Sequence, residues 1–192
     1  MTEGQGMKNY TIKDLVLMAL FAALTGVLSF IYIPIPFSPV PVTAQTVSPM
    51  LAGVLLGPKK AAMSQLVYIF LGVVGLPIFA GFRSGPAVLF GESGGYLVGF
   101  VVGSYVIGLI YQLLNERCNS IISSTLSIIT GGIFVVYFFG VLWLMFVLEL
   151  GLNEAIMAGV VPYLIGDVFK VFGTVILVES LNTLKEKGII FT

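Results

Sequence analysis

Long apolar segments, each close to the length that crosses a lipid bilayer, limit most strongly what this chain can fold into. A spanning helix needs about 20 apolar residues, and six segments reach or approach that length. They cover residues 15–35, 42–57, 61–76, 95–114, 125–148 and 156–181. Because 58% of the side chains are hydrophobic and only 9% are charged, the composition lies outside that of soluble domains. The sequence therefore predicts an all-α integral membrane protein with six transmembrane helices.

No polar stretch is long enough for a second, soluble domain, so we expect a single membrane domain across residues 1–192. The second segment is short for a span and stops at Gly57-Pro58, so a re-entrant hairpin is the alternative there. Four prolines at and just after the end of the first segment favour an extended loop, because proline locks φ and lacks an N–H group. These are Pro34, Pro36, Pro39 and Pro41.

Lysine and arginine indicate the orientation, because they accumulate in cytoplasmic loops. With six spans and an internal N-terminus, only Arg83 lies outside. The predicted cytoplasmic cations are Lys8, Lys13, Lys59, Lys60, Arg117, Lys185 and Lys187. If the second segment did not span, Lys59 and Lys60 would move outside, so the bias favours a short spanning helix. We therefore expect both termini in the cytoplasm and no cleavable signal at the N-terminus.

Asp167 and Lys170 lie in the middle of the last apolar segment, three positions apart and therefore on one helix face. An ionisable side chain inside a bilayer costs about 2.5–3.5 kcal/mol on insertion scales. One interpretation is a pair that neutralises itself and pins two helices. We favour a ligand site, because a purely structural pair can be replaced by apolar packing at little cost in stability. The predicted orientation makes such a site reachable from outside.

The predicted outer loops hold further candidates. The run 72–86 combines glycines, two phenylalanines and Arg83, and such a loop can fold over a ligand. A solvated loop charge explains Arg83 equally well. Ser93 is a candidate N-cap for the fourth helix, and a helix start of this kind can receive a carboxylate. Capping alone is the simpler explanation for Ser93.

Small residues at intervals of four indicate where helices approach each other closely in lipid. In the fourth helix they are Gly91, Gly95, Gly99 and Gly103. Packing is the expected role of Gly99 and Gly103. Ala19 and Ala23 form a similar patch in the first helix. Packing inside the bundle is the default there too, although an exposed patch would suit a partner helix.

Missing residue types argue against several protein classes. The chain has no histidine and one cysteine, Cys118, which excludes an internal disulfide and a cysteine-based metal site. It has no G-x-x-x-x-G-K-[ST] phosphate loop and, without histidine, no His/Asp pair. A net charge of zero argues against nucleic acid as a partner. We therefore expect neither an enzyme nor a resident cofactor.

Five motifs spread between residues 15 and 181 are specific in combination. They are Pro41-Val-Thr-Ala-Gln45-Thr, Leu56-Gly-Pro-Lys59, Gly75-Leu-Pro-Ile-Phe-Ala-Gly81, Gly91-Glu-Ser-Gly-Gly-Tyr96 and Pro162-Tyr-Leu-Ile-Gly-Asp167-Val-Phe-Lys170. With them the chain resembles the BioY proteins, the biotin-binding S components of energy-coupling factor (ECF) vitamin transporters. It departs from the family's common Gly-Pro-Thr-Gly-Gly-Tyr motif at Glu92 and Ser93.

The resemblance implies a compact six-helix S component in the cell membrane. Such a protein captures biotin from outside and docks on a membrane coupling subunit driven by two ATPases. The family's A-x-x-x-A docking motif falls on Ala19 and Ala23, and its polar motif in the last helix falls on Asp167 and Lys170.

The chemistry of biotin agrees with these residues. Its ureido ring has two N–H donors and one carbonyl acceptor, its bicycle is apolar and its tail is a carboxylate. We expect Asp167 to accept a ureido N–H, and Lys170 to donate to the ureido carbonyl or pair with Asp167. The tail would lie near Arg83 or the start of the fourth helix. The remaining predicted binding residues are Gln45, Phe79, Gly95, Tyr96 and Tyr163.

Two functions of other classes are alternatives. An autonomous carrier would use the charged pair as an ion or proton relay and would need no partner. A small intramembrane enzyme would use Lys170 as a base or nucleophile, but the chain offers neither histidine nor a second clustered acid to assist it.

Overall fold

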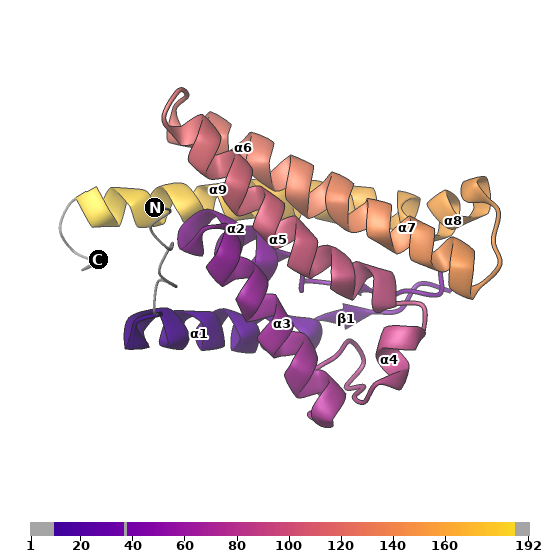
Figure 1. The fold of residues 1–192 in the computed structure, drawn as a ribbon. Coiled ribbons are helices and arrows are strands. Elements are labelled where there is room, and N and C mark those ends of the chain that lie inside the picture. Colours follow the sequence, from indigo (N-terminus) through magenta and orange to yellow (C-terminus); the bar gives the residue numbers. More distant parts are fainter. Residues whose placement is uncertain (1–9, 37, 187–192) are drawn as a thin grey trace, which may run out of the picture.

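The computed structural model describes residues 10–36 and 38–186, which form a bundle of helices with one short hairpin of strands (Figure 1). The helices α1 and α9 begin and end, respectively, at the same end of the bundle. The elements are α1 (Ile12–Ser29), β1 (Tyr32–Ile33), β2 (Val42–Thr43), α2 (Val47–Leu56), α3 (Pro58–Val74), α4 (Ala87–Phe90), α5 (Gly94–Asn115), α6 (Ser120–Ile128), the π-helix η1 (Ile129–Val135), α7 (Val136–Val147), α8 (Leu152–Gly159), the 3-10 turn η2 (Val161–Tyr163) and α9 (Leu164–Glu186).

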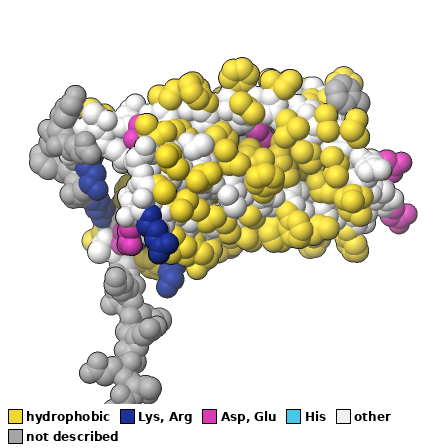
Figure 2. Space-filling view, turned by 90° about the horizontal axis from the view of Figure 1, so that it is seen from above, with side chains coloured by type: hydrophobic (Ala, Val, Ile, Leu, Met, Phe, Trp, Pro, Cys, Tyr) yellow, Lys and Arg dark blue, Asp and Glu magenta, His cyan; other side chains and the backbone are white. Residues whose placement is uncertain are grey.

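The all-α membrane fold class is confirmed, and fewer helices than the six predicted reach spanning length. By length and composition, four helical stretches of the described chain can cross a membrane. They are Ile12–Ser29, Gly94–Asn115, Ser120–Val147 and Leu152–Lys185. The helices α2 and α3, with 10 and 17 residues, are shorter. On the face that Figure 2 shows, hydrophobic side chains cover the middle of the molecule, as expected for a protein surrounded by lipid.

Two predicted segment boundaries need correction. The first segment is helical only to Ser29, and the chain continues into β1, which pairs antiparallel with β2. The predicted continuous helix 156–181 is also wrong. It is interrupted around Pro162, between α8 and α9, because proline lacks the N–H that an α-helix requires and its ring clashes with the preceding turn.

The cations near the start of α1 and the end of α9 lie close together. Lys13 and Lys185 line one groove together with Cys118, from the α5–α6 connection. Lys60, in the first turn of α3, forms an ion pair with Asp14 of α1. These cationic segments therefore share one end of the bundle (Figure 2). Lys8 and Lys187 are outside the described residues.

A buried polar cluster ties the first three long elements together. The hydroxyl oxygen of Thr25 on α1 lies 2.8 Å from Ser48 Oγ on α2 and 3.2 Å from Gln65 Oε1 on α3. All three side chains are fully buried. Because an unsatisfied polar group inside the bundle costs free energy, this cluster favours one relative placement of α1, α2 and α3.

The glycines of α5 permit a close helix contact in the bundle core. A Cβ atom added at Gly99 would lie 2.9 Å from Val136 Cα, and one at Gly103 would lie 2.5 Å from the carbonyl oxygen of Gly131. Such distances are shorter than a side chain allows, so α5 packs directly against the backbone of η1 and α7. The expected packing role of Gly99 and Gly103 is confirmed.

Because of this contact, we expect a glycine-to-alanine substitution to affect the melting temperature differently at Gly103 and at Gly173. We expect Gly103→Ala to lower the melting temperature in detergent, because the added methyl group separates α5 from η1. Gly173→Ala on α9 is the matched control, since nothing lies within 4 Å of an added Cβ there. Its effect should be neutral or stabilising by up to about 1 kcal/mol from helix propensity. Equal melting temperatures for the two variants would contradict this description of the contact.

Candidate functional site

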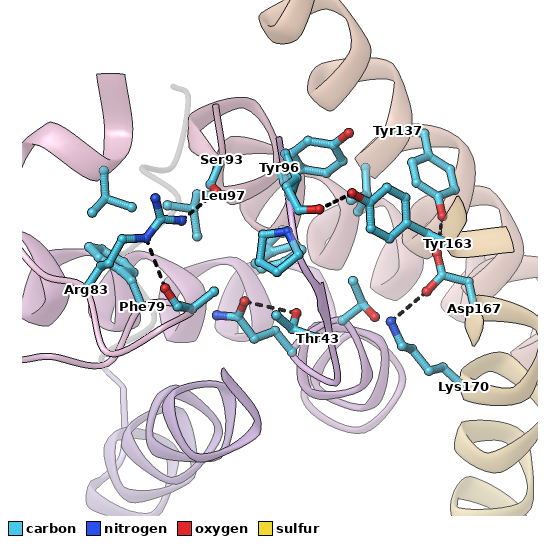
Figure 3. Close-up of a pocket in the computed structure, with 18 residues that line it drawn as sticks. Thr43, Phe79, Arg83, Ser93, Tyr96, Leu97, Tyr137, Tyr163, Asp167 and Lys170 are labelled. Atoms are coloured by element: carbon cyan, nitrogen blue, oxygen red, sulfur yellow. Dashed lines mark hydrogen bonds and ion pairs between the residues drawn. The ribbon is translucent and has the colours of Figure 1, made fainter. Parts of the chain in front are cut away.

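A cavity lies between the β1–β2 hairpin, the α3–α4 connection and the helices α5, α7 and α9 (Figure 3). Most of its wall is apolar or aromatic, and its charged side chains are Arg83, Asp167 and Lys170. The lining residues are Val40, Pro41, Thr43, Gln45, Thr46, Phe79, Ala80, Arg83, Val88, Ser93, Tyr96, Leu97, Phe100, Val136, Tyr137, Tyr163, Asp167 and Lys170.

One side of the cavity carries the predicted charged pair. Lys170 Nζ donates to Asp167 Oδ1 at 2.8 Å, and Asp167 is only 5% exposed. Because the helix is interrupted before Leu164, Asp167 lies in the first turn of α9 rather than in the middle of a helix. The partial positive charge of a helix N-terminus favours a carboxylate there. The helix start and Lys170 thus both compensate the buried negative charge.

Tyr137 is the third member of this polar group, and the sequence analysis missed it. Its hydroxyl donates to Asp167 Oδ2 from the neighbouring helix α7, on the same side of the cavity (Figure 3). Nothing in the sequence distinguishes this tyrosine from other aromatic residues of the apolar segment 125–148. Only the structure shows that it faces a carboxylate.

Arg83 lies on the other side of the cavity (Figure 3). Its Nε donates to the carbonyl oxygen of Ala80 at 3.0 Å, and its terminal NH2 donates to Ser93 Oγ at 3.2 Å. Ser93 occupies the N-cap position of α5 but makes no capping hydrogen bond, so its expected capping role is wrong. Among the described residues, no carboxylate forms an ion pair with Arg83. A cation and a hydroxyl at a helix start can together receive an anion.

Aromatic side chains form the wall between the two polar sides. Phe79 is 1% exposed and packs edge-on against Tyr68, with ring centroids 5.6 Å apart. Tyr96 is also buried, and its hydroxyl donates to the carbonyl oxygen of Gly159 at 2.7 Å. The Tyr96 hydroxyl and the edge of the Phe79 ring are thus already engaged within the protein. These residues therefore offer a ligand mainly apolar ring surface.

Tyr163 holds the proline-rich connection over the cavity. Its hydroxyl donates to the carbonyl oxygen of Val40 and contacts the hydroxyl of Ser38. Ser38 in turn donates to the carbonyl oxygen of Ala158 at 2.7 Å. The connection between β1 and β2 is thereby attached to α8 and η2, which closes this side of the cavity.

Hydrogen bonds to neighbouring side chains orient the amide group of Gln45. Its amide nitrogen donates to the hydroxyl of Tyr68, and its amide oxygen accepts from Thr43 at 3.1 Å. The hydroxyl of the adjacent Thr46 is buried and has no hydrogen-bond partner among the described residues. This side of the cavity therefore offers both a fixed amide and an unsatisfied hydroxyl.

Seven of the eight predicted binding residues line the cavity, and Gly95 does not. A Cβ atom at Gly95 would lie 2.2 Å from Trp143 Cβ, so this glycine serves the contact between α5 and α7. Ala19 and Ala23 are exposed on the outside of α1, away from the cavity-lining residues.

Comparison with known proteins identifies the family. The profile of the BioY family matches residues 3–187. The chain belongs to the BioY family. Among its BioY relatives is a biotin transporter of Rhizobium etli, 38% identical over 163 residues, covering 82% of this chain and 87% of the relative. Another, from Thermotoga maritima, is 34% identical over 174 residues, covering 91% of this chain and 98% of the relative.

A solved structure gives the same result for the fold. The crystal structure of the S component for biotin from an ECF-type ABC transporter superposes with a TM-score of 0.82 at 31% identity. The match covers 95% of both chains. The resemblance to BioY proteins is thus confirmed, and the named relatives are transporters or transporter components rather than enzymes.

Proposed function

We propose that this protein is the substrate-binding S component of an ECF-type ABC transporter and captures biotin at the outer face of the plasma membrane. The observation that carries the proposal is the arrangement of the cavity. It has an anion–cation pair on one side, a cation on the other and aromatic walls between them. Biotin has the matching sequence of groups, namely a ureido head, an apolar bicycle and a carboxylate tail. BioY family membership supports the same ligand.

The head group of biotin is assigned to the side that holds Asp167. A carboxylate has about four lone-pair directions and an ammonium group has three N–H donors. Among the described residues, hydrogen bonds use only one donor of Lys170 and one direction on each oxygen of Asp167. Asp167 can therefore accept a ureido N–H while Lys170 donates to the ureido carbonyl.

The carboxylate tail is assigned to Arg83. This is the cavity cation that has no ion-pair partner in the described chain, and Ser93 beside it supplies a hydroxyl. Phe79, Tyr96 and Tyr163 would then cover the bicycle, with Gln45 at the wall between the polar sides. Gly95 would act only through helix packing.

The orientation follows from the distribution of charge. We propose that α2 and α3 cross the membrane together with the four longer stretches, giving six spans in one domain. The end of the bundle with Lys13, Lys60 and Lys185 would face the cytoplasm together with both termini, since lysines concentrate on that side. The proline-rich connection and Arg83 would then face outward.

The partners are assigned from the surface of α1. Ala19 and Ala23 are exposed, whereas Phe21 and Ala22 point into the bundle. Two small residues four apart allow a second helix to approach closely in lipid. We assign this patch to a membrane coupling subunit that works with two ATPases, because the chain has no phosphate loop of its own.

The proposed ligand is tested by calorimetric titration of the detergent-purified protein with biotin, thiamine and riboflavin. Tight binding of biotin without ATP is expected, with little heat from the other two vitamins. No heat from biotin with folded protein would refute the proposal. Uptake by the protein alone in vesicles, driven by a proton gradient, would instead favour the autonomous carrier.

The charged pair is tested with Asp167→Asn and Lys170→Ala in the same titration. Removing one member of a buried hydrogen-bonded charge pair typically costs about 2–5 kcal/mol in binding, or about thirtyfold to several thousandfold in affinity. We expect biotin affinity to fall by at least the lower figure in both variants. Lys185→Ala, which changes a cation far along α9, is the control and should bind like the parent. Parent-like binding by both pair variants would show that the head-group site is elsewhere.

The docking patch is tested with Ala19→Trp and Ala23→Trp. A bulky side chain should hold the partner helix away, so co-purification with the coupling subunit and ATP-driven uptake should be lost while biotin binding persists. Phe134→Trp is the control, because Phe134 is 67% exposed on η1. Normal complex formation would mean that the patch faces lipid. Loss of biotin binding as well would mean that the patch belongs to the core.

A further inference from the structure

The hydrogen bond from Tyr137 to Asp167 connects α7 and α9. Both helices line the cavity, but each packs mainly against helices other than its partner in this bond. Helix α9 packs chiefly against α2 and α6, whereas α7 packs chiefly against α5 and α8. The hydroxyl of Tyr137 crosses between them to reach Asp167 Oδ2. The other oxygen, Oδ1, accepts from Lys170 on the carboxylate's own helix.

The orientation of the Asp167 carboxylate is fixed by two donors, one to each of its oxygens. The terminal torsion of an aspartate side chain is broad, so Lys170 alone leaves the carboxylate plane free to rotate about one anchored oxygen. Tyr137 anchors the second oxygen from a different helix and removes that freedom. Each oxygen then keeps acceptor capacity in a direction set by the protein.

We propose that Tyr137 is a positioning residue that gives Asp167 its preference for ligands presenting N–H donors. This inference rests on the proposed function, because the ligand is taken to be biotin and its ureido N–H groups are the donors. Tyr137 acts through Asp167: it holds the acceptor where an N–H can meet it. A ligand whose ureido nitrogen carries a methyl group in place of the hydrogen is therefore rejected.

Tyr137 also lines the cavity, so its ring is a second way in which it affects binding. The two roles differ in what they discriminate. Ring packing stabilises biotin and its N-methyl derivatives alike, whereas a positioned acceptor distinguishes between them. The ratio of affinities for the two kinds of ligand therefore reports the positioning role and is insensitive to packing.

The experiment titrates the full-length protein in detergent with biotin, with the two derivatives methylated on either ureido nitrogen, and with biotin amide. We expect the parent to prefer biotin over at least one N-methyl derivative by about tenfold or more, the scale of a hydrogen bond to a charged group. In Tyr137→Phe the affinity for biotin should fall by about tenfold, and that preference should shrink to less than about threefold. The preference for biotin over biotin amide should not change, because the tail is assigned to Arg83.

Further variants separate the hydroxyl from the ring. Tyr137→Gln replaces the hydroxyl donor to Asp167 with an amide N–H donor, on a side chain of about the size of leucine. This variant should therefore keep more of the preference for N–H ligands than Tyr137→Leu. This pair also serves if Tyr137→Phe does not fold. Tyr111→Phe is the matched control, because the Tyr111 hydroxyl lies 3.5 Å from Ser120 Oγ in the groove that contains Lys13 and Lys185. It should reproduce the parent values.

The outcomes distinguish this inference from the proposed function. If the parent does not bind biotin, the proposed function fails. If the parent binds biotin and Tyr137→Phe keeps the N–H preference, whether or not its affinity changes, Tyr137 has no positioning role and the proposed function stands. Equal preferences in Tyr137→Gln and Tyr137→Leu would overturn the inference in the same way.

Discussion

A pair of opposite charges inside an apolar bundle is the constraint around which the cavity is organised. Either charge alone would be strongly unfavourable there, so Asp167 and Lys170 must stay together. The break before α9 lowers the cost further, because it gives Asp167 a helix N-terminus as well as a cationic neighbour. Tyr137 then compensates the second oxygen from another helix. Three separate features of the fold thus support one carboxylate.

Close helix packing places the tyrosines of α5 and α7 around that carboxylate. The glycines of α5 bring its backbone against η1 and α7, and Gly140 of α7 in turn leaves room for the ring of Tyr96. Tyr96 then reaches the end of α8, and Tyr163 reaches the proline-rich connection. The same tyrosine hydroxyls that line the cavity therefore also hold its outer elements in place.

Most of the helices could be predicted from the sequence, because long apolar segments leave few alternatives to a spanning helix. The charged pair was also predictable, since a charge in such a segment is conspicuous. The face that each helix turns toward the cavity was not predictable. Tyr137 lies in a segment that is apolar on all sides, so no periodicity shows which face meets the cavity. The interruption of the last helix had a visible signal in Pro162, but the apolar residues around it outweighed that signal.

The π-helix η1 has a consequence for everything that follows it in the chain. A π-helical turn holds more residues than an α-helical one, and one residue in an α-helix corresponds to a rotation of about 100°. The stretch Ser120–Val147 is continuous, so the wider turns at Ile129–Val135 set the rotational phase of α7. Without that shift, the direction that now belongs to Tyr137 would fall to a neighbouring residue. The polar side of the cavity thus depends on the helical winding of the residues immediately before Tyr137.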